Sequence, residues 1–402
     1  MKNKMLLIIS FLIVLIFYSC DTTGPVNDQQ NPPGTQENIL WPSLAESPWP
    51  MQHRNPQAIG RGNSMENVGL IKWEFNFTEL GEDLVSGVVV DEDSSIYFLT
   101  EMNLSAGLYC IDQRGNKKWK VELGNARRFT TPIVTKNNDI LIVDYNTLKS
   151  FNKEGELNWS YNFSNSLFWI ETPQIDKIGN IYLLDNMHNL YKISSVGNLD
   201  WQINNSNFKS STGTFGMSFS PNGKMLYVPG DSVTLSAIDI ETAALKWVYG
   251  QKKMMTSPIV DSQGNIYCQL NDKIISLTSN GLLRWSVNYN EFVVNDNKPT
   301  IDKNGNVFFS TKDSLYSYDF NGNYRWGKLL PKPTDSPLIC DEDGNIYASF
   351  FIDGISMIKY HTTGAIIWEI NFNTNGQLYS SPILSFDDNI IFPTEKKVFS
   401  IK

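Results

Sequence analysis

The residues that most often carry chemistry are few in this chain and are spread over its length. Its histidines are His53, His188 and His361, and no two of them are close enough in sequence to form a local metal-ligand pair. The stretch Asp341–Asn345 offers carboxylates, but its glycine comes at the fourth position, whereas a calcium loop has it at the sixth. Comparable hairpins elsewhere in the chain keep one aspartate, so a turn is expected here. The sequence predicts neither a metal site nor a cofactor.

Three of the four cysteines are expected to be inert. Cys110, Cys268 and Cys340 each lie within or at the end of an apolar stretch, where a buried free thiol is the usual state. Because their number is odd, they do not indicate a disulfide framework. No nucleophile elbow, phosphate-binding glycine loop or local acid–base pair accompanies them. The chain is therefore predicted not to be an enzyme.

The fourth cysteine, Cys20, follows a targeting segment. Lys2 and Lys4 precede an apolar run from Met5 to Phe17, which is too short to span a bilayer as a permanent anchor. The run closes in Phe-Tyr-Ser-Cys, which resembles the lipobox of bacterial lipoproteins, although leucine is more common where Phe17 stands. The resemblance implies a signal peptide over residues 1–19 and acylation of Cys20. The alternative is an ordinary secretory signal in which the cysteine is incidental.

A repeat of short apolar segments runs through the rest of the chain. In Thr256–Tyr289, four such segments are separated by turn sequences that contain Gly, Asn and Asp, which predicts four antiparallel strands joined by hairpins. The tryptophan of the fourth segment recurs at spacings of 38 to 46 residues, close to the length of a propeller blade. The recurring residues are Trp73, Trp119, Trp159, Trp201, Trp247, Trp285, Trp326 and Trp368.

This repeat predicts an all-β fold, a single eight-bladed propeller of four-stranded antiparallel blades over residues 65–402. After Trp368 the chain has only three strands left for the last blade, and Gly69–Phe77 is expected to supply the fourth. Pairing of the first segment with the last closes the ring and removes its exposed edge.

Two segments separate the signal peptide from the ring. Residues 20–48 are rich in Pro, Gly, Asn, Gln and Thr and are predicted to start with the acylated cysteine and form a flexible tether. Residues 49–64 begin Trp-Pro-Met and contain Gly60-Arg61, which resembles the entry segment of bacterial propellers with pyrroloquinoline-quinone-like repeats. We expect this entry segment to pack Trp49 and Met51 against the ring as a plug.

The turn before Trp247 strengthens this resemblance. Residues 237–247 are similar to the tryptophan-docking motif of quinoprotein dehydrogenases, with Ala243 and Ala244 where the motif has Gly and Lys. The resemblance implies that each outer-strand indole docks on the neighbouring blade. Those enzymes also place a disulfide between adjacent cysteines against the quinone, and no two cysteines are adjacent here. A quinone-dependent dehydrogenase is therefore the least favoured function.

Composition and architecture leave two other classes of function. The formal net charge of −9 disfavours binding to nucleic acid. We expect the protein to contact the membrane through its lipid anchor alone. The favoured function is a monomeric, non-catalytic scaffold for envelope proteins, because the architecture resembles the lipoprotein propeller of the outer-membrane barrel-assembly machinery. The alternative is a propeller that binds or degrades extracellular glycans. The protein is predicted to be exported and lipid-anchored, at the outer membrane or cell surface rather than the inner membrane.

A group of basic and aromatic connectors is predicted to form the binding surface. Three successive loops between blades differ from the other connectors, which are mostly short and polar, and successive loops lie on adjacent blades. Arg and Trp are enriched at interface hot spots, and aromatic side chains also suit sugars. The candidate residues are Arg127, Arg128, Phe168, Trp169, Phe208 and Lys209. The alternative is that the two phenylalanines fill the ends of the blade cores while the arginines lie in water.

Overall fold

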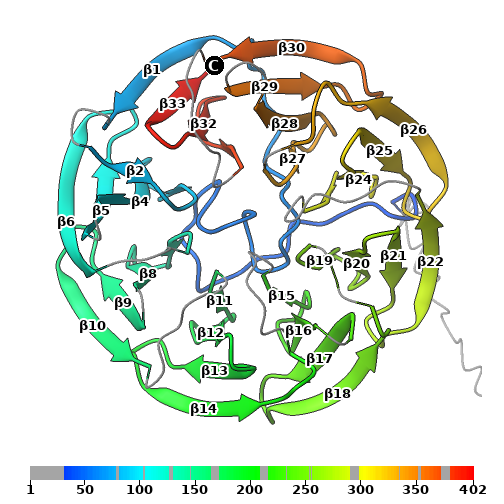
Figure 1. Ribbon diagram of the computed structural model, residues 1–402, viewed down its shortest axis with the longest axis horizontal. Coiled ribbons are helices and arrows are strands. Elements are labelled where there is room, and N and C mark those ends of the chain that lie inside the picture. The colour runs from blue at the N-terminus through cyan, green and yellow to red at the C-terminus, as the bar shows by residue number, and fades with distance from the viewer. Residues whose placement is uncertain are drawn as a thin grey trace, which may run out of the picture. The chain divides into compact units, whose positions relative to one another are not determined.

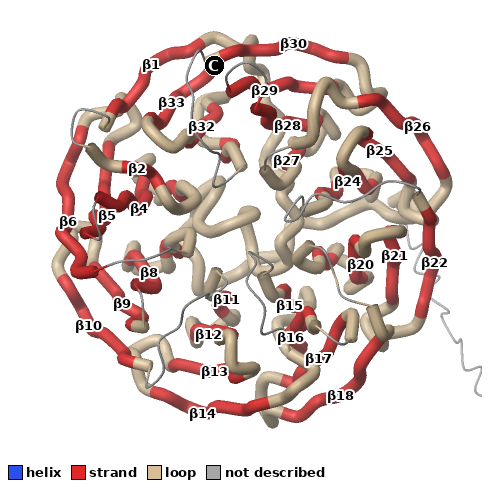
Figure 2. The backbone as a smooth tube through the Cα atoms, viewed as in Figure 1, coloured by secondary structure: helices blue, strands red, loops and turns tan. Residues whose placement is uncertain are grey.

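Eight small antiparallel sheets follow one another along the chain and form a ring in the computed structural model (Figure 1). The structure describes residues 31–77, 81–102, 105–125, 130–144, 146–163, 172–208, 216–231, 233–252, 254, 256–289, 298–334, 336–351, 355–372 and 381–402. The regular elements of these residues are strands (Figure 2). A helix long and apolar enough to cross a bilayer is not found in this described part. The prediction of an all-β, eight-bladed propeller is confirmed.

We number the blades 1 to 8 in chain order, and each runs from an inner strand to an outer strand. Blades 1 to 4 contain β2 (Asp83–Leu84), β3 (Val89–Val90), β4 (Ile96–Met102), β5 (Ser105–Ile111) and β6 (Lys117–Asn125); β7 (Ile133–Val134), β8 (Ile140–Asp144), β9 (Thr147–Phe151) and β10 (Leu157–Asn162); β11 (Gln174–Ile175), β12 (Ile181–Leu184), β13 (Asn189–Ile193) and β14 (Leu199–Asn204); β15 (Ser218–Phe219), β16 (Met225–Pro229), β17 (Leu235–Asp239) and β18 (Ala244–Tyr249). Blades 5 to 8 contain β19 (Ile259–Val260), β20 (Ile266–Gln269), β21 (Lys273–Leu277) and β22 (Leu283–Asn288); β23 (Thr300–Ile301), β24 (Val307–Ser310), β25 (Ser314–Tyr318) and β26 (Tyr324–Leu329); β27 (Ile339–Cys340), β28 (Ile346–Phe351), β29 (Ile355–Tyr360) and β30 (Ile366–Asn371); β31 (Ile383–Leu384), β32 (Ile390–Pro393), β33 (Lys397–Ile401) and β1 (Ile71–Asn76).

The ring closes as the sequence predicts. β1 pairs antiparallel with β33, with Ile71 opposite Ile401 and Phe75 opposite Val398. Two further backbone hydrogen bonds join Leu70 and Lys402, each 2.8 Å long. The first strand of the ring therefore completes the blade that the last three strands begin. Blade 1 departs from the four-stranded pattern because the short β2 also pairs with β4.

Burial follows the position of each strand in its blade. The second strand is buried along its whole length in β8 and β12, because both faces of a blade pack against neighbouring blades. The outer strands instead alternate between exposed and half-buried residues, as in β10 and β14. Their half-buried positions hold the repeated tryptophan and the apolar residue two places after it. The alternation with a period of two therefore reflects one strand face that packs against the neighbouring blade and one face that is exposed to solvent.

The repeated tryptophans dock on the next blade around the ring. Each is preceded by a β-bulge, such as the one between Leu157 and Trp159, which turns the indole towards the neighbouring blade. For six of the eight, the indole N–H donates to a backbone carbonyl just before that blade's outer strand, and the ring lies against the glycine two residues further on, as the ring of Trp159 also does at Gly197. The donor and acceptor pairs are Trp73 with Gln113, Trp119 with Lys153, Trp247 with Ser279, Trp285 with Phe320, Trp326 with Thr362 and Trp368 with Asn67.

Trp201 is the exception that the sequence marks. It faces blade 4, whose last hairpin is one residue longer and has Ala243 in place of the glycine. Ala243 adopts a positive φ of 56°, and among the described residues the buried indole nitrogen of Trp201 has no hydrogen-bond partner. The substitution noticed in the docking motif therefore coincides with the loss of the indole hydrogen bond.

Opposite substitutions at these hairpins are expected to have opposite effects on stability. Gly322 has a φ of 83°, and a Cβ there would lie 2.7 Å from the ring of Trp285, so Gly322→Ala should destabilise the fold by at least about 2 kcal/mol. Ala243→Gly relieves a strained φ and should stabilise by up to about 1 kcal/mol. Urea unfolding of both variants checks this, and a shift of both midpoints in the same direction would contradict the assignment.

The predicted tether is shorter than residues 20–48. Residues 33–402 form one compact unit, and Trp41, Leu44 and Ala45 are all buried in it. Gly34 packs against Gly305 and Phe320, which lie in two hairpins of blade 6. The polar composition of residues 33–48 suggested a solvated linker, but their polar groups bind the ring instead.

Candidate binding site at the mouth of the channel

The N-terminal segment, blue in Figure 1, starts at the outer side of the ring beside β22 and then fills its centre. We call Trp49–Gly62 together with Trp41–Ser43 the plug. The plug accepts hydrogen bonds from the free inner edges of the blades, which would otherwise present unpaired amides to the channel. The amide donors and plug carbonyls are Val90 with Trp49 (3.0 Å), Val134 with Pro50 (2.8 Å), Phe219 with Pro56 (2.7 Å), Val260 with Gln57 (2.9 Å), Ile301 with Ile59 (3.4 Å) and Cys340 with Gly60 (2.9 Å).

The plug thereby makes one circuit of the ring in chain order. Blades 1, 2, 4, 5, 6 and 7 are bound by successive plug carbonyls, and Gly62 then packs against Leu384 of blade 8. Blade 3 is bound from the other part of the plug, where the indole N–H of Trp41 donates to the carbonyl of Ile175 over 2.8 Å. Trp49 and Met51 are both buried.

Two basic side chains of the plug are buried with it. The guanidinium of Arg61 donates to the carbonyl of Asp302 (3.0 Å) and to the side-chain oxygen of Asn38 (3.1 Å). The ring of His53 faces the carbonyls of Ala58 and Leu338, and burial, with a smaller contribution from the charge of Lys298, lowers its pKa to about 4. His53 is therefore neutral in the folded protein at neutral pH.

His53 is expected to make the fold sensitive to mild acid. Its pKa is lowered on folding, so its contribution to stability is complete above pH 6.5 and is lost as the pH falls towards 4, because the unfolded state takes up a proton that the folded state excludes. The loss over that window is roughly 3 kcal/mol. Urea unfolding of wild type and His53→Gln between pH 7 and 4.5 measures it, and equal pH slopes for the two would contradict this role.

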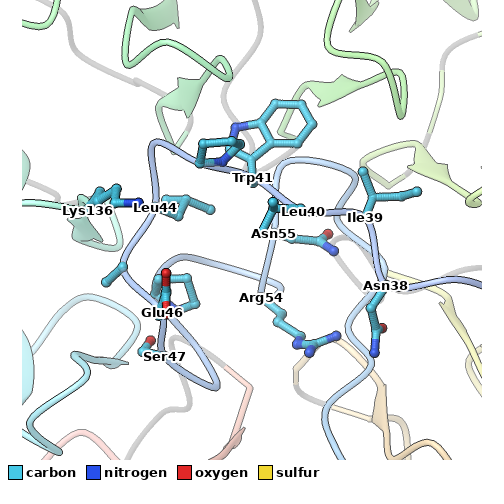
Figure 3. Close-up of a pocket in the computed structure, with 13 residues that line it drawn as sticks. Asn38, Ile39, Leu40, Trp41, Leu44, Glu46, Ser47, Arg54, Asn55 and Lys136 are labelled. Carbon is cyan, nitrogen blue, oxygen red and sulfur yellow. The ribbon is translucent and has the colours of Figure 1, made fainter.

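A pocket of about 300 Å³ lies between the plug and blade 2 (Figure 3). It is on the face of the ring that carries the turns between first and second strands, which we call the turn face. Its apolar wall includes Trp41, Leu44 and Pro50, and its polar lining includes Arg54 and Lys136. Trp41 is held rigidly, since its ring lies 5.6 Å from that of Phe219 and below the ammonium of Lys177.

Arg54 gives the pocket its chemical character. Burial and the nearby charge of Arg61 lower the pKa of Arg54 to about 10, with Glu342 acting in the opposite direction. Within the described part of the chain, its guanidinium forms no ion pair and no side-chain hydrogen bond. The carboxylate of Glu342 is bound by Asn38 over 2.8 Å. The pocket therefore presents a half-buried cation that is not neutralised by direct contact.

A larger cleft of about 640 Å³ adjoins the pocket. The two cavities share Pro42 and Lys136, and the cleft continues between blades 2 and 3 past Ile178 and Val196. The side chains of Ile178 and Val196 are 79% and 65% exposed, so the cleft offers open apolar surface next to the basic pocket.

The patch predicted from the connectors is mostly outside the described residues. Arg127, Arg128, Phe168, Trp169 and Lys209 all lie there, and their role stays a sequence-based prediction. Phe208 is described and is fully buried in the core shared by blades 2 to 4, so its ring is not part of an exposed patch. The apolar character that suggested a contact residue instead serves packing, which is the alternative considered for this residue.

The acidic hairpins are structural. In Asp341–Asn345 one carboxylate oxygen of Asp341 accepts the amide of Asn345, and the other accepts its side-chain amide (2.9 Å) and the hydroxyl of Tyr347 (3.1 Å). Asp261 is bound in the same way by Asn265 and Tyr267. In the part of the chain that is described, no group of three or more His, Cys, Asp or Glu residues is placed to hold a metal ion.

Comparison with known proteins identifies the fold and no closer relationship. No protein-family model and no curated protein matches the sequence. Similar solved structures include quinohemoprotein alcohol dehydrogenase from Comamonas testosteroni (TM-score 0.69, 13% identity, 90% of this chain and 81% of that one), BamB from Moraxella catarrhalis (0.63, 13%, 83% and 99%) and Sqt1 from Saccharomyces cerevisiae (0.64, 12%, 84% and 99%). The chain thus shares its propeller fold with quinoprotein dehydrogenases and with BamB.

The described residues do not fit the quinone arrangement expected of such dehydrogenases. Cys110, Cys268 and Cys340 are free, buried and in three different blades, so they supply no adjacent pair. Burial raises the pKa of Cys110 to about 12 and raises the pKa values of the other two as well. These thiols belong to the packed blades and are not among the residues that line the pocket.

Sequence reasoning missed the pocket because it forms between segments far apart in the chain. Arg54 and Trp41 were present in the segments taken as plug and tether, and Lys136 was in an ordinary hairpin. The only sequence signal was a basic residue three positions after the Trp-Pro-Met of the entry segment, in an otherwise acidic protein.

Proposed function

We propose that this protein is a non-catalytic scaffold of the bacterial cell envelope, held to a membrane by a lipid on Cys20. In this proposal it binds other envelope proteins through the turn face of its ring. The observation that carries the proposal is the plug, because the chain's own residues pair with the inner edges of the blades and fill the channel. The centre of the ring thus serves to hold the N-terminal segment and to shape a binding pocket beside it.

Two further observations support this function. The compact unit begins beside two hairpins of the turn face, where Gly34 packs, and this face also carries the pocket. The lipobox resemblance supplies the anchor at the other end of that tether. The fold itself is shared with dehydrogenases and with BamB, and therefore does not select among these functions.

Crosslinking in native membranes followed by mass spectrometry tests the proposal. Wild type should be labelled by palmitate, sediment with membranes and crosslink to a small set of envelope proteins. Cys20→Ser should lose the label and the membrane attachment. Persistent labelling of Cys20→Ser would contradict the anchor, and specific glycan binding on an array without protein partners would favour the glycan-binding alternative.

A further inference from the structure

The channel-mouth pocket carries a net positive charge that suits an anionic group. Arg54 and Lys136 line it, against the single carboxylate of Glu46 at its exposed rim (Figure 3). Lys136 is exposed, while Arg54 is partly buried and has no direct counter-charge among the described residues. An incoming carboxylate would pair with Arg54 in a two-point geometry and gain strength from the low local polarity.

The backbone that presents Arg54 is strained. His53 and Arg54 have φ values of 55° and 76°, in the left-handed region that side chains other than glycine rarely adopt. Two such residues cost roughly 1–3 kcal/mol each and persist only when the surroundings hold them. The amide of Arg54 bonded to the carbonyl of Met51 and the ring of His53 between two carbonyls provide that hold. Strain of this kind concentrates at ligand sites.

The shape of the cavities suits the end of a chain. The pocket holds only about 300 Å³, and Trp49 and Met51, on either side of its lining residue Pro50, are buried. The adjoining cleft provides a further 640 Å³ or so with exposed Ile178 and Val196 along it. A polypeptide whose last residues lie in the cleft would place its terminal carboxylate in the pocket beside Arg54.

We propose that this pocket binds the free C-terminus of a partner polypeptide whose last side chains are apolar. The terminal carboxylate pairs with Arg54, and the preceding apolar side chains lie past Lys136 along the cleft towards Ile178. This inference rests on the proposed scaffold function and names the part of the partner that is recognised.

Peptide binding to the purified full-length chain in detergent tests the inference. The probes are two pools of acetylated hexapeptides with apolar residues randomised at the last three positions, one with free carboxylates and one with C-terminal amides. We expect retention of members of the acid pool and at least tenfold weaker binding of the same sequences as amides. Equal binding of the two forms, or no binding of the acid pool, would overturn the proposal.

Variants separate recognition from stability. Arg54→Gln should weaken binding of the tightest free-carboxylate peptide at least tenfold and leave binding of its C-terminal amide unchanged. Loss of binding of both forms would indicate only a damaged fold. Lys224→Gln removes a lysine from a hairpin of blade 4 outside the pocket and should change neither. N-acetyl-leucine binding as tightly as the peptides would overturn the chain-end assignment in favour of a small acid. Peptide binding by the purified protein does not depend on lipid attachment. A failure of the proposed envelope function would therefore appear in the crosslinking and labelling experiment and not in these binding assays.

Discussion

Deletion of Gly69–Phe77 is expected to abolish folding of the ring. The deleted residues supply the outer strand of blade 8 and all of its pairing with β33. They also remove Phe77, which is fully buried, and Phe75, whose ring lies 5.9 Å from that of Tyr109 in blade 1. Both the last sheet and its interface with the first blade would be lost. Circular dichroism and gel filtration should report an unfolded or aggregated protein.

A matched replacement distinguishes the strand from its particular sequence. The six residues of β10 have the same pattern of burial as those of β1. A chain in which they replace β1 should therefore still close its ring, although less stably. Cooperative unfolding of the deletion variant at the wild-type midpoint would show that closure by β1 is not needed.

Deletion of residues 33–46 should destabilise the protein, whereas deletion of residues 21–32 should not. The first deletion removes the buried side chains of Trp41 and Leu44, worth about 4 kcal/mol together. It also removes the hydrogen bonds from Trp41 and Ser43 to blade 3. Thermal unfolding should shift down by roughly 5–10 °C. Equal melting temperatures for the two deletions would mean that residues 33–46 do not contribute to the folded ring.

The fold could be predicted because its signals are local and repeated. Each outer strand repeats the tryptophan with its alternating neighbours, and the hairpins repeat the aspartate and glycine that their backbone needs. Closure was visible as a blade with one strand too few and a segment such as Ile71–Asn76 that fits it. Even the one irregular docking site was marked, by Ala243 where the motif has glycine.

The channel could not be predicted in the same way. Its plug has no period, because Trp41, Pro50 and Gln57 each bind a different blade through a different local geometry. The composition of residues 33–48 therefore indicated a tether. Phe208 was placed in a surface patch because an aromatic residue in a connector can serve either a ligand or the core. The pocket at Arg54 arises only when the plug and blade 2 come together.

Amide hydrogen exchange of the inner strands tests the central claim that the plug pairs with the blades. The amides of Val90, Val134 and Val260 point to the channel and are bound there by carbonyls of Trp49, Pro50 and Gln57. Without the plug they would lie on a free sheet edge. In the full-length chain these amides should be protected as strongly as those of the neighbouring second strands. Exchange at the rate of an unstructured peptide, with the second strands still protected, would contradict it.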